Sequence, residues 1–403
     1  EGAFKFAFVG AGQGGSRIAE SFHKLGYRKI GVINTAQQDL NSINVENKLC
    51  IGSGGAGKDR AVAAKCFEEK RDDVLDFMRR SFGEDVDRIF VCAGAGGGSG
   101  AGTLVPLVKT AQELQETVKS GSKKVGVILA LPKYSEGRKV NSNAYETLKE
   151  ACALVDQGIV SPLVIIDNEK TSKLYSNVSV SNFWQTANMS TAGVFHLFNM
   201  TASKDSSYSS FDSSDYKNVL DSGITIFGAT PVPKWDDPVS ISRAVRSIAQ
   251  SGSMSGGIDV STANSAGAIL IGGKEVLDNI PQSSLDEAFD QLTRILRSGS
   301  VVHRGIYSGD KNIGQIKSID KAYSMVDTEY IFHCEDDWEF YDYNFIEKSL
   351  DILSTNDKIY TVWLREYQNY KVVRNGQPVN PNIINNIYRI LIPFKERTNI
   401  WSG

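Results

Sequence analysis

Glycine is concentrated in one short segment that could hold a polyphosphate. Residues 94–102 contain six glycines in nine positions and follow the apolar run 88–92. In a strand, glycine-rich turn and helix arrangement, backbone N–H groups point into one concavity, and only glycine lets the backbone approach phosphates closely. A flexible linker is the alternative, but apolar sequence flanks the segment on both sides. The segment therefore predicts a phosphate-binding loop.

A second cluster suited to chemistry is acidic. The apolar run 330–333 leads into Glu335, Asp336 and Asp337. Carboxylates at the end of a strand can coordinate a hard divalent cation such as Mg²⁺ or Mn²⁺. The alternative is an ordinary strand-end loop with solvated carboxylates. The pattern makes Asp336 and Asp337 candidate metal ligands.

Strands and helices alternate in the part of the chain that carries the glycine-rich segment. This alternation predicts an α/β fold with a mostly parallel sheet covered on both faces. Ligands of such sheets bind beyond the carboxyl ends of the strands, where the glycine-rich loops 10–16 and 52–57 and the loop 34–39 also fall. We expect strands at Phe4–Val9, Lys29–Ile33, Lys48–Ile51, Arg88–Cys92, Val125–Leu131 and Leu163–Ile166, with helices at Ala61–Arg80 and Thr103–Thr117.

A further set of elements follows residue 221. Strands are expected at Gly223–Gly228, Ala266–Ile271 and Val301–Tyr307, and helices at Ser240–Ser251 and Ser284–Leu296. These elements continue the alternation of strands and helices.

Composition limits the classes of function. The net charge of −3 gives no global basic field for nucleic acid, and five scattered cysteines without CxxC spacing favour reduced thiols over disulfides or zinc. No run approaches 18 apolar residues, so we expect a cytoplasmic protein without a membrane partner. Only three of the 37 glycines lie beyond residue 311, which indicates a separate segment there.

The motifs resemble those of the tubulin/FtsZ GTPases. The loop Gly96-Gly-Gly-Ser-Gly-Ala-Gly102 is similar to the signature loop of that family, and Gly12-Gln-Gly-Gly-Ser-Arg-Ile18 to its first phosphate loop. The resemblance covers about residues 3–310. It implies a Rossmann-like GTP-binding domain at 1–177, a central helix at 178–205 and a second, activation-type domain at 206–310.

The resemblance also implies GTP or GDP as the ligand, with Mg²⁺ reached indirectly by Gln13. Glu136 would contact the ribose, Trp184 would stack on guanine, and Asn188, one helical turn later, would bind its edge. Two residues depart from the family pattern: Ala36 replaces an aspartate on the magnesium side, and Val140 replaces an arginine on the guanine side. The complete set of implied nucleotide contacts is Gly12, Gln13, Gly14, Ser16, Asn34, Ala56, Gly57, Gly96, Gly97, Gly98, Ser99, Gly100, Glu136, Trp184 and Asn188.

Two carboxylates, Asp212 and Asp215, keep the spacing of the family's catalytic loop. Such a pair can orient a water for attack on a γ-phosphate. In the family this loop completes the site of the next subunit, so the implied partner is a second copy of the chain in a head-to-tail filament. Nucleic acid would be reached only through an adaptor. A non-polymerising nucleotide-binding protein of the same fold is the alternative.

The segment 311–403 resembles a fragment of a GT-A type glycosyltransferase, on the residues Tyr330-Ile-Phe-His-Cys-Glu-Asp-Asp-Trp338. This resemblance implies a metal-dependent transferase, with Mn²⁺ as a candidate cofactor. The segment lacks a preceding nucleotide-binding strand–helix unit, so we expect no transferase activity from it. A metal-dependent transferase is kept as a further alternative.

Overall fold

The computed structural model divides the chain into two units, 1–311 and 312–403. It describes residues 2–118, 122–176, 180–232, 234–237, 239–251, 258–296 and 300–309, and five short strands further on. In the second unit β10 pairs with β14, β14 with β13, and β11 with β12, all antiparallel. These strands are β10 (Thr361–Leu364), β11 (Val373–Arg374), β12 (Gln377–Pro378), β13 (Ile383–Ile384) and β14 (Ile387–Ile390).

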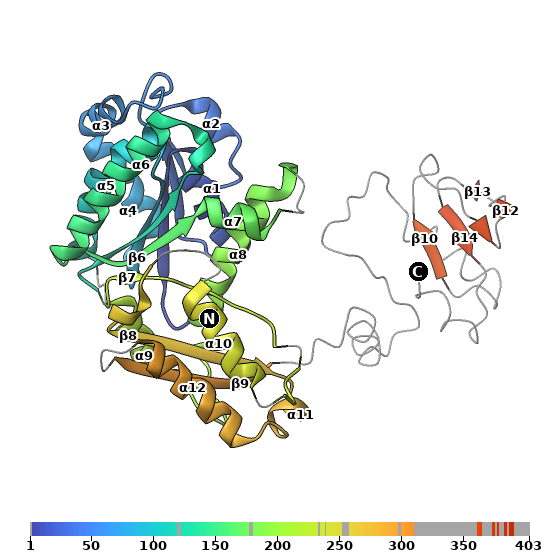
Figure 1. Ribbon diagram of the computed structural model, residues 1–403. Helices are drawn as coiled ribbons and strands as arrows, with labels where there is room; N and C mark the ends of the chain where they lie inside the picture. The colour runs from blue at the N-terminus through green and yellow to red at the C-terminus, as the bar shows by residue number, and fades with distance from the viewer. Residues whose placement is uncertain are drawn as a thin grey trace. The chain divides into compact units, whose positions relative to one another are not determined.

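A seven-stranded parallel sheet forms the centre of the first unit, in the order β3-β2-β1-β4-β5-β6-β7 (Figure 1). Every residue of β1 and β2 is buried, as expected for strands covered on both faces. The predicted α/β fold with a parallel sheet is confirmed. The strands are β1 (Phe6–Ala11), β2 (Ile30–Asn34), β3 (Lys48–Cys50), β4 (Arg88–Gly94), β5 (Val125–Leu131), β6 (Val160–Asp167) and β7 (Ile224–Thr225).

Two hydrophobic clusters lie on the two faces of the sheet, because successive side chains of a strand point to opposite faces. On one face, Phe67, Met78 and Leu107, from the helices between β3 and β5, pack against strand residues such as Val9. On the other face, Phe22 of α1 and Phe195 of α8 pack against strand residues such as Phe8. The helices of this part are α1 (Gly12–Lys24), α2 (Gln37–Asn41), α3 (Arg60–Glu69), α4 (Arg71–Phe82), α5 (Ser99–Thr117), α6 (Arg138–Asp156), α7 (Asn168–Leu174) and α8 (Val180–Thr201).

A smaller layer follows, built on the parallel pair β8 and β9. Helix α10 packs on α12, and Ile241, Leu285 and Phe289 share a third hydrophobic cluster. None of the helices that the structure describes is both long and apolar enough to span a membrane. The elements are α9 (Ser213–Leu220), α10 (Ser240–Ser251), β8 (Ser265–Gly272), α11 (Lys274–Leu277), α12 (Gln282–Leu296) and β9 (Val301–Ser308).

Four predicted elements differ from the observed ones. The expected helix 61–80 is two helices, because Lys70 leaves the helical region at φ −118° and ψ 14°. Helix α5 begins at Ser99, inside the glycine-rich segment, and the expected loop 34–39 runs into α2. The strand assigned to the second domain at 223–228 is the short β7, which pairs with β6 and extends the main sheet.

Candidate functional site

The glycine-rich loops after β1 and β4 touch each other backbone to backbone. A Cβ atom built on Gly12 would lie 2.7 Å from the amide nitrogen of Gly100, and one on Gly100 would lie 2.9 Å from the carbonyl oxygen of Ala11. Gly12 also has φ +69°, which disfavours other residues. Glycine is therefore required at both positions, and the two loops form one continuous backbone surface.

The loops after β2 and β3 join this surface from the other side. A Cβ built on Gly98 would lie 2.8 Å from the Cβ of Ala56. The hydroxyls of Thr35 and Ser99 are 2.7 Å apart and share a hydrogen bond. The structure thus brings together four loops at the carboxyl ends of adjacent strands. The predicted residues among these contacts are Gly12, Ala56, Gly98, Ser99 and Gly100.

Asn143 on α6 connects the loops after β3 and β4 by hydrogen bonds. It is only 5% exposed, and its Nδ2 donates to the carbonyl oxygens of Lys58 (2.9 Å) and Gly96 (3.2 Å). Lys58 has φ +63°, a left-handed conformation that is unusual for a residue other than glycine. Asn143 was not predicted, although a polar residue among the apolar positions of a helix was a usable signal.

Ser16, in the first turns of α1, carries an unsatisfied polar atom. Its side chain is 1% exposed, and its Oγ has no hydrogen-bond partner within the part of the chain that the structure describes. A buried hydroxyl without a partner is costly, so a ligand atom at this position would relieve that cost. Gln13 and Gly14, by contrast, are exposed at the mouth of the loop.

Asn34, at the end of β2, is fixed by a neighbouring acid. It is buried, and its Nδ2 donates to Asp39 Oδ2 at 3.2 Å while its Oδ1 accepts from the amide of Ala36 at 3.2 Å. The family resemblance implied an acid at position 36, where the chain has alanine. The structure supplies a carboxylate three residues later, at Asp39 in α2, which the sequence analysis did not single out.

The loop after β5 meets the start of α8. Glu136 is exposed, and its Oε1 accepts a 2.8 Å hydrogen bond from the amide of Lys133, so its carboxylate stabilises its own turn. Lys133 Nζ lies 4.7 Å from the ring centre of Phe183 and 6.0 Å from that of Trp184. Trp184 and Asn188 are half-buried on consecutive turns of α8. Lys133, which was not predicted, connects these two regions.

The acid pair is built into the start of α9. Asp212 is the N-cap residue, and its Oδ1 accepts from the amide of Asp215 (2.9 Å), while Asp215 Oδ2 accepts from the amide of Asp212 (3.2 Å). This reciprocal capping box starts a helix, so the acids lie at a helix terminus and not in a loose loop. Asp215 Oδ1 is also 2.7 Å from His303 Nδ1 on β9.

Tyr307 on β9 holds the backbone of Phe211, the residue that precedes Asp212. Its hydroxyl accepts from the amide of Phe211 (2.7 Å) and donates to the carbonyl oxygen of the same residue (2.9 Å). Burial raises the pKa of Tyr307, and the nearby carboxylates of Asp212 and Asp215 raise it further. The phenol therefore stays protonated, and the segment preceding α9 is held in one position.

Comparison with known proteins identifies the first of these regions. Residues 5–176 match the model described as the Tubulin/FtsZ family, GTPase domain.

This segment belongs to the tubulin/FtsZ family.

Relatives with curated names agree with this membership. Over 240 residues the chain is 27% identical to the tubulin-like protein TubZ of Bacillus cereus, which covers 54% of the chain and 53% of TubZ. It is 30% identical over 193 residues to the cell division protein FtsZ of Buchnera aphidicola, covering 45% and 44%. The chain thus spans about half the length of the curated relatives it matches.

The fold is also that of solved structures. The GDP-form protofilaments of Bacillus thuringiensis TubZ match with a TM-score of 0.66 at 18% identity, over 77% of this chain and 85% of that one. CetZ2 from Haloferax volcanii, in a GTPγS-bound protofilament, matches with a TM-score of 0.59 at 22% identity, over 79% and 99%. The shared architecture extends beyond the matched GTPase domain.

Metal ligands were predicted in both parts of the chain. Among the residues that the structure describes, no group of three or more His, Cys, Asp or Glu side chains could hold a metal ion. The predicted ligands Asp336 and Asp337, and the transferase-like segment around them, lie outside the described residues.

Proposed function

We propose that the protein binds GTP at the glycine-rich loops, hydrolyses it to GDP and phosphate, and polymerises head to tail. One observation carries this proposal: the loops and the acidic start of α9 lie at opposite ends of the first unit. In Figure 1, α2 and α3 mark the loop end and α9 lies at the other. A subunit cannot bring its own Asp212 to its own nucleotide, whereas the next subunit in a row can.

The loop end has the groups that a nucleoside triphosphate needs. Backbone N–H groups at the starts of α1 and α5 would donate to the phosphates, which a helix N-terminus favours. The unpartnered hydroxyl of Ser16 would take a further ligand oxygen. Mg²⁺ bound with the phosphates would neutralise part of their charge, with Gln13 and Asp39 as the nearby oxygen donors. Trp184 and Asn188 are proposed to contact the base, and Glu136 the ribose.

The acid end would supply water activation. Asp212 is exposed at the N-cap of α9, so its carboxylate can face a second molecule. In the assembled pair, Asp212 and Asp215 would orient a water toward the γ-phosphorus. The water oxygen would bond to phosphorus as the bond to the β–γ bridging oxygen breaks, and GDP would leave. The names of two fold relatives include protofilaments, which supports the same assembly here.

A non-polymerising nucleotide-binding protein remains the second candidate. Two residues favour it: Ala36 lacks the expected carboxylate, and Val140 is buried against Gly96, where the family resemblance implied a base-side arginine. Such a protein would bind nucleotide at the same loops, but its acid pair would have no catalytic role.

GTP turnover per subunit, measured against protein concentration with Mg²⁺ present, tests the proposal. Turnover that is negligible below a threshold and rises above it is expected, because each site needs a neighbour. A low rate independent of concentration would instead select the non-polymerising candidate.

Two variants of Asp212 sharpen the test. Asp212→Ala should lower turnover about 100-fold or more while GTP binding and sedimentable polymer remain. Asp212→Asn retains a good N-cap residue, so helix stability should be kept, but it removes the charge. Equal loss of turnover in both variants assigns the role to the carboxylate. Loss in the alanine variant alone would mean that only the cap matters.

A further inference from the structure

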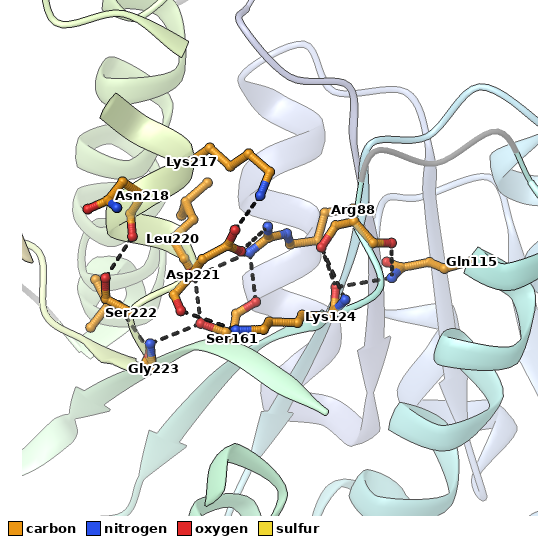
Figure 2. Close-up of polar contacts among 12 residues, drawn as sticks. Arg88, Gln115, Lys124, Ser161, Lys217, Asn218, Leu220, Asp221, Ser222 and Gly223 are labelled. Carbon is orange, nitrogen blue, oxygen red and sulfur yellow. Dashed lines mark hydrogen bonds and ion pairs between the residues drawn. The ribbon is translucent and has the colours of Figure 1, made fainter. Parts of the chain in front are cut away.

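A buried arginine lies at the start of β4, at the opposite end of that strand from the glycine-rich loop. Arg88 is 3% exposed, and its guanidinium makes three hydrogen bonds. Nη1 donates to the carbonyl oxygens of Ser161 (2.8 Å) and Leu220 (3.2 Å), and Nη2 donates to Asp221 Oδ1 at 2.6 Å (Figure 2). A planar guanidinium suits such divergent acceptors, whereas a lysine ammonium does not.

Two of these acceptors form the C-terminal end of α9. Leu220 is its last residue and Asp221 its C-cap. Lys124 Nζ donates to the carbonyl oxygen of Asp221 at 3.3 Å, and Lys217 pairs with the second oxygen of its carboxylate. Cations at a helix C-terminus are favourable because they face the negative end of the helix dipole. The end of α9 is therefore fixed by Arg88 and two lysines.

The main sheet also makes hydrogen bonds to the end of α9. Ser161, in β6, donates from its Oγ to the carbonyl oxygen of Leu220 (2.7 Å) and accepts from the amide of Gly223 (3.0 Å). On the other side, Gln115 accepts from the amide of Ile89 (2.6 Å) and donates to the carbonyl oxygen of Lys124 (3.0 Å). Figure 2 shows these contacts as one connected network that ties β4, β6 and α5 to α9.

Helix α9 is short enough to carry a constraint from one end to the other. Its eight residues span about 12 Å, and two of them, Tyr216 and Leu220, are buried on its inner face. A two-turn helix with a packed face moves as one piece. The position of its C-terminus therefore sets the position of Asp212 and Asp215 at its N-terminus.

We propose that Arg88 is a positioning residue for hydrolysis: by holding the end of α9 against the main sheet, it sets where a subunit presents its acid pair to the neighbour's nucleotide. The inference rests on the function proposed above. Arg88 lies at the opposite end of β4 from the glycine-rich loop, so its effect should fall on turnover in the polymer and not on GTP affinity.

The test compares Arg88→Lys with Arg79→Lys, the same substitution at an exposed ion pair with Asp76 on α4. Three quantities are measured: GTP affinity below the assembly threshold, the amount of sedimentable polymer, and turnover per subunit in the polymer. Arg88→Lys should keep affinity and polymer within about twofold and lose turnover about tenfold, a loss of transition-state stabilisation. Arg79→Lys should stay within about twofold in all three.

A double variant separates positioning from general weakening of the fold. If Arg88 acts through the acid pair, Arg88→Lys combined with Asp212→Ala should turn over no more slowly than Asp212→Ala alone, because coupled sites are non-additive. Additive losses, or a parallel loss of GTP affinity, would overturn the inference. If Arg88→Lys does not fold, Asp221→Asn, which keeps the shape and removes the charge, is tested in the same way.

The outcomes also separate this inference from the function on which it rests. If Asp212→Ala lowers turnover but neither Arg88→Lys nor Asp221→Asn does, the positioning role is wrong and the proposed function stands. If wild-type turnover is independent of concentration and Asp212→Ala has no effect, the proposed function is wrong and the positioning role falls with it.

Discussion

The two ends of the first unit are held by different kinds of contact. At the loop end, Gly12 and Gly100 meet backbone to backbone, at distances that leave no room for a side chain. At the opposite end, α9 is held by contacts between polar side chains, Asp215 with His303 and Asp221 with Arg88. Backbone contacts tolerate no substitution, whereas side-chain contacts can be weakened in steps. We therefore expect all-or-none effects at the first end and graded effects at the second.

The strongest test of this comparison is Gly15→Ala in α1. A Cβ at this position would lie 2.1 Å from the carbonyl oxygen of Cys92 in β4, so a strand or a helix must shift. We expect a loss of about 3 kcal/mol in the free energy of unfolding, together with loss of GTP binding. Urea denaturation and titration with a fluorescent GTP analogue measure the two effects.

Gly97→Ala is the matched control. Nothing lies within 4 Å of a Cβ at Gly97, and its φ is not positive. Its stability should stay within about 0.5 kcal/mol of wild type. A comparable loss of stability in both variants would mean that the loops are not held by backbone contact.

The sequence was sufficient to predict the sheet and the loops that meet on it. Strand–helix alternation placed β1, β2, β4 and β5 within a few residues, because buried strands and glycine turns leave a local pattern. Boundaries inside the glycine-rich segment were less accurate. Helix α5 starts at Ser99 because its first turn packs against Ala11 and Arg60, contacts that are distant in sequence.

The residues that the sequence analysis missed depend on long-range contacts. Asn143 and Lys58 are 85 positions apart, and Arg88 and Asp221 are 133 apart. No local periodicity records such a pairing. The acid pair was predicted from its resemblance to the family's catalytic loop, but the capping box that fixes it requires the position of the start of α9. A serine-rich approach to that helix looks like a loop in sequence alone.

Asn143→Ala tests whether side-chain contacts also matter at the loop end, because it removes one of them. The carbonyl oxygens of Lys58 and Gly96 would lose their donor in a buried site. An unsatisfied buried polar group costs about 2 kcal/mol, so we expect that loss in unfolding free energy and a weaker affinity for GTP. Asn279→Ala is the control: its Nδ2 donates to the carbonyl oxygen of Glu275 at 2.6 Å on an exposed surface. Because water can replace that donor, stability should stay within about 0.5 kcal/mol of wild type, and GTP affinity should not change.

If Asn143→Ala is as harmless as Asn279→Ala, the loop end is held by glycine contacts alone. The contrast between the two ends would then be complete. A loss near that of Gly15→Ala would mean instead that a single amide side chain matters as much as the backbone packing.

His303→Gln tests the side-chain end directly. It replaces the ring that lies 2.7 Å from Asp215 Oδ1. Its Nε2 also lies 3.2 Å from Asn218 Oδ1 on α9. Each lost hydrogen bond costs about 1 kcal/mol, and turnover in the polymer should fall several-fold because Asp215 becomes freer to rotate. Arg304→Gln, the next residue on β9 and 53% exposed, is the control. Unchanged turnover in His303→Gln would show that the capping box alone positions Asp215.

The smallest expected effect concerns pH and the charge on Asp221. Burial alone would raise the pKa of Asp221, but the hydrogen bond from Lys217 and the charge of Arg88 outweigh it, so the pKa lies below its ordinary value of 3.8. The folded state then binds this proton less tightly than the unfolded state. The resulting stability is fully present above that ordinary value and is lost as the pH falls through the lower, folded-state pKa.

Asp221→Asn cannot titrate, so the free-energy difference between wild type and this variant should shrink on acidification. We expect a change of less than about 1 kcal/mol between about pH 6 and pH 3, because the carboxylate is partly exposed and solvent screens the pair. Urea denaturation of both proteins across that range measures it. A difference that stays constant would mean that Arg88 holds α9 through its bonds to the carbonyl oxygens of Ser161 and Leu220, which do not titrate. Neutral hydrogen bonds would then carry the constraint at this end as well, and the contrast with the loop end would lie in geometry and not in charge.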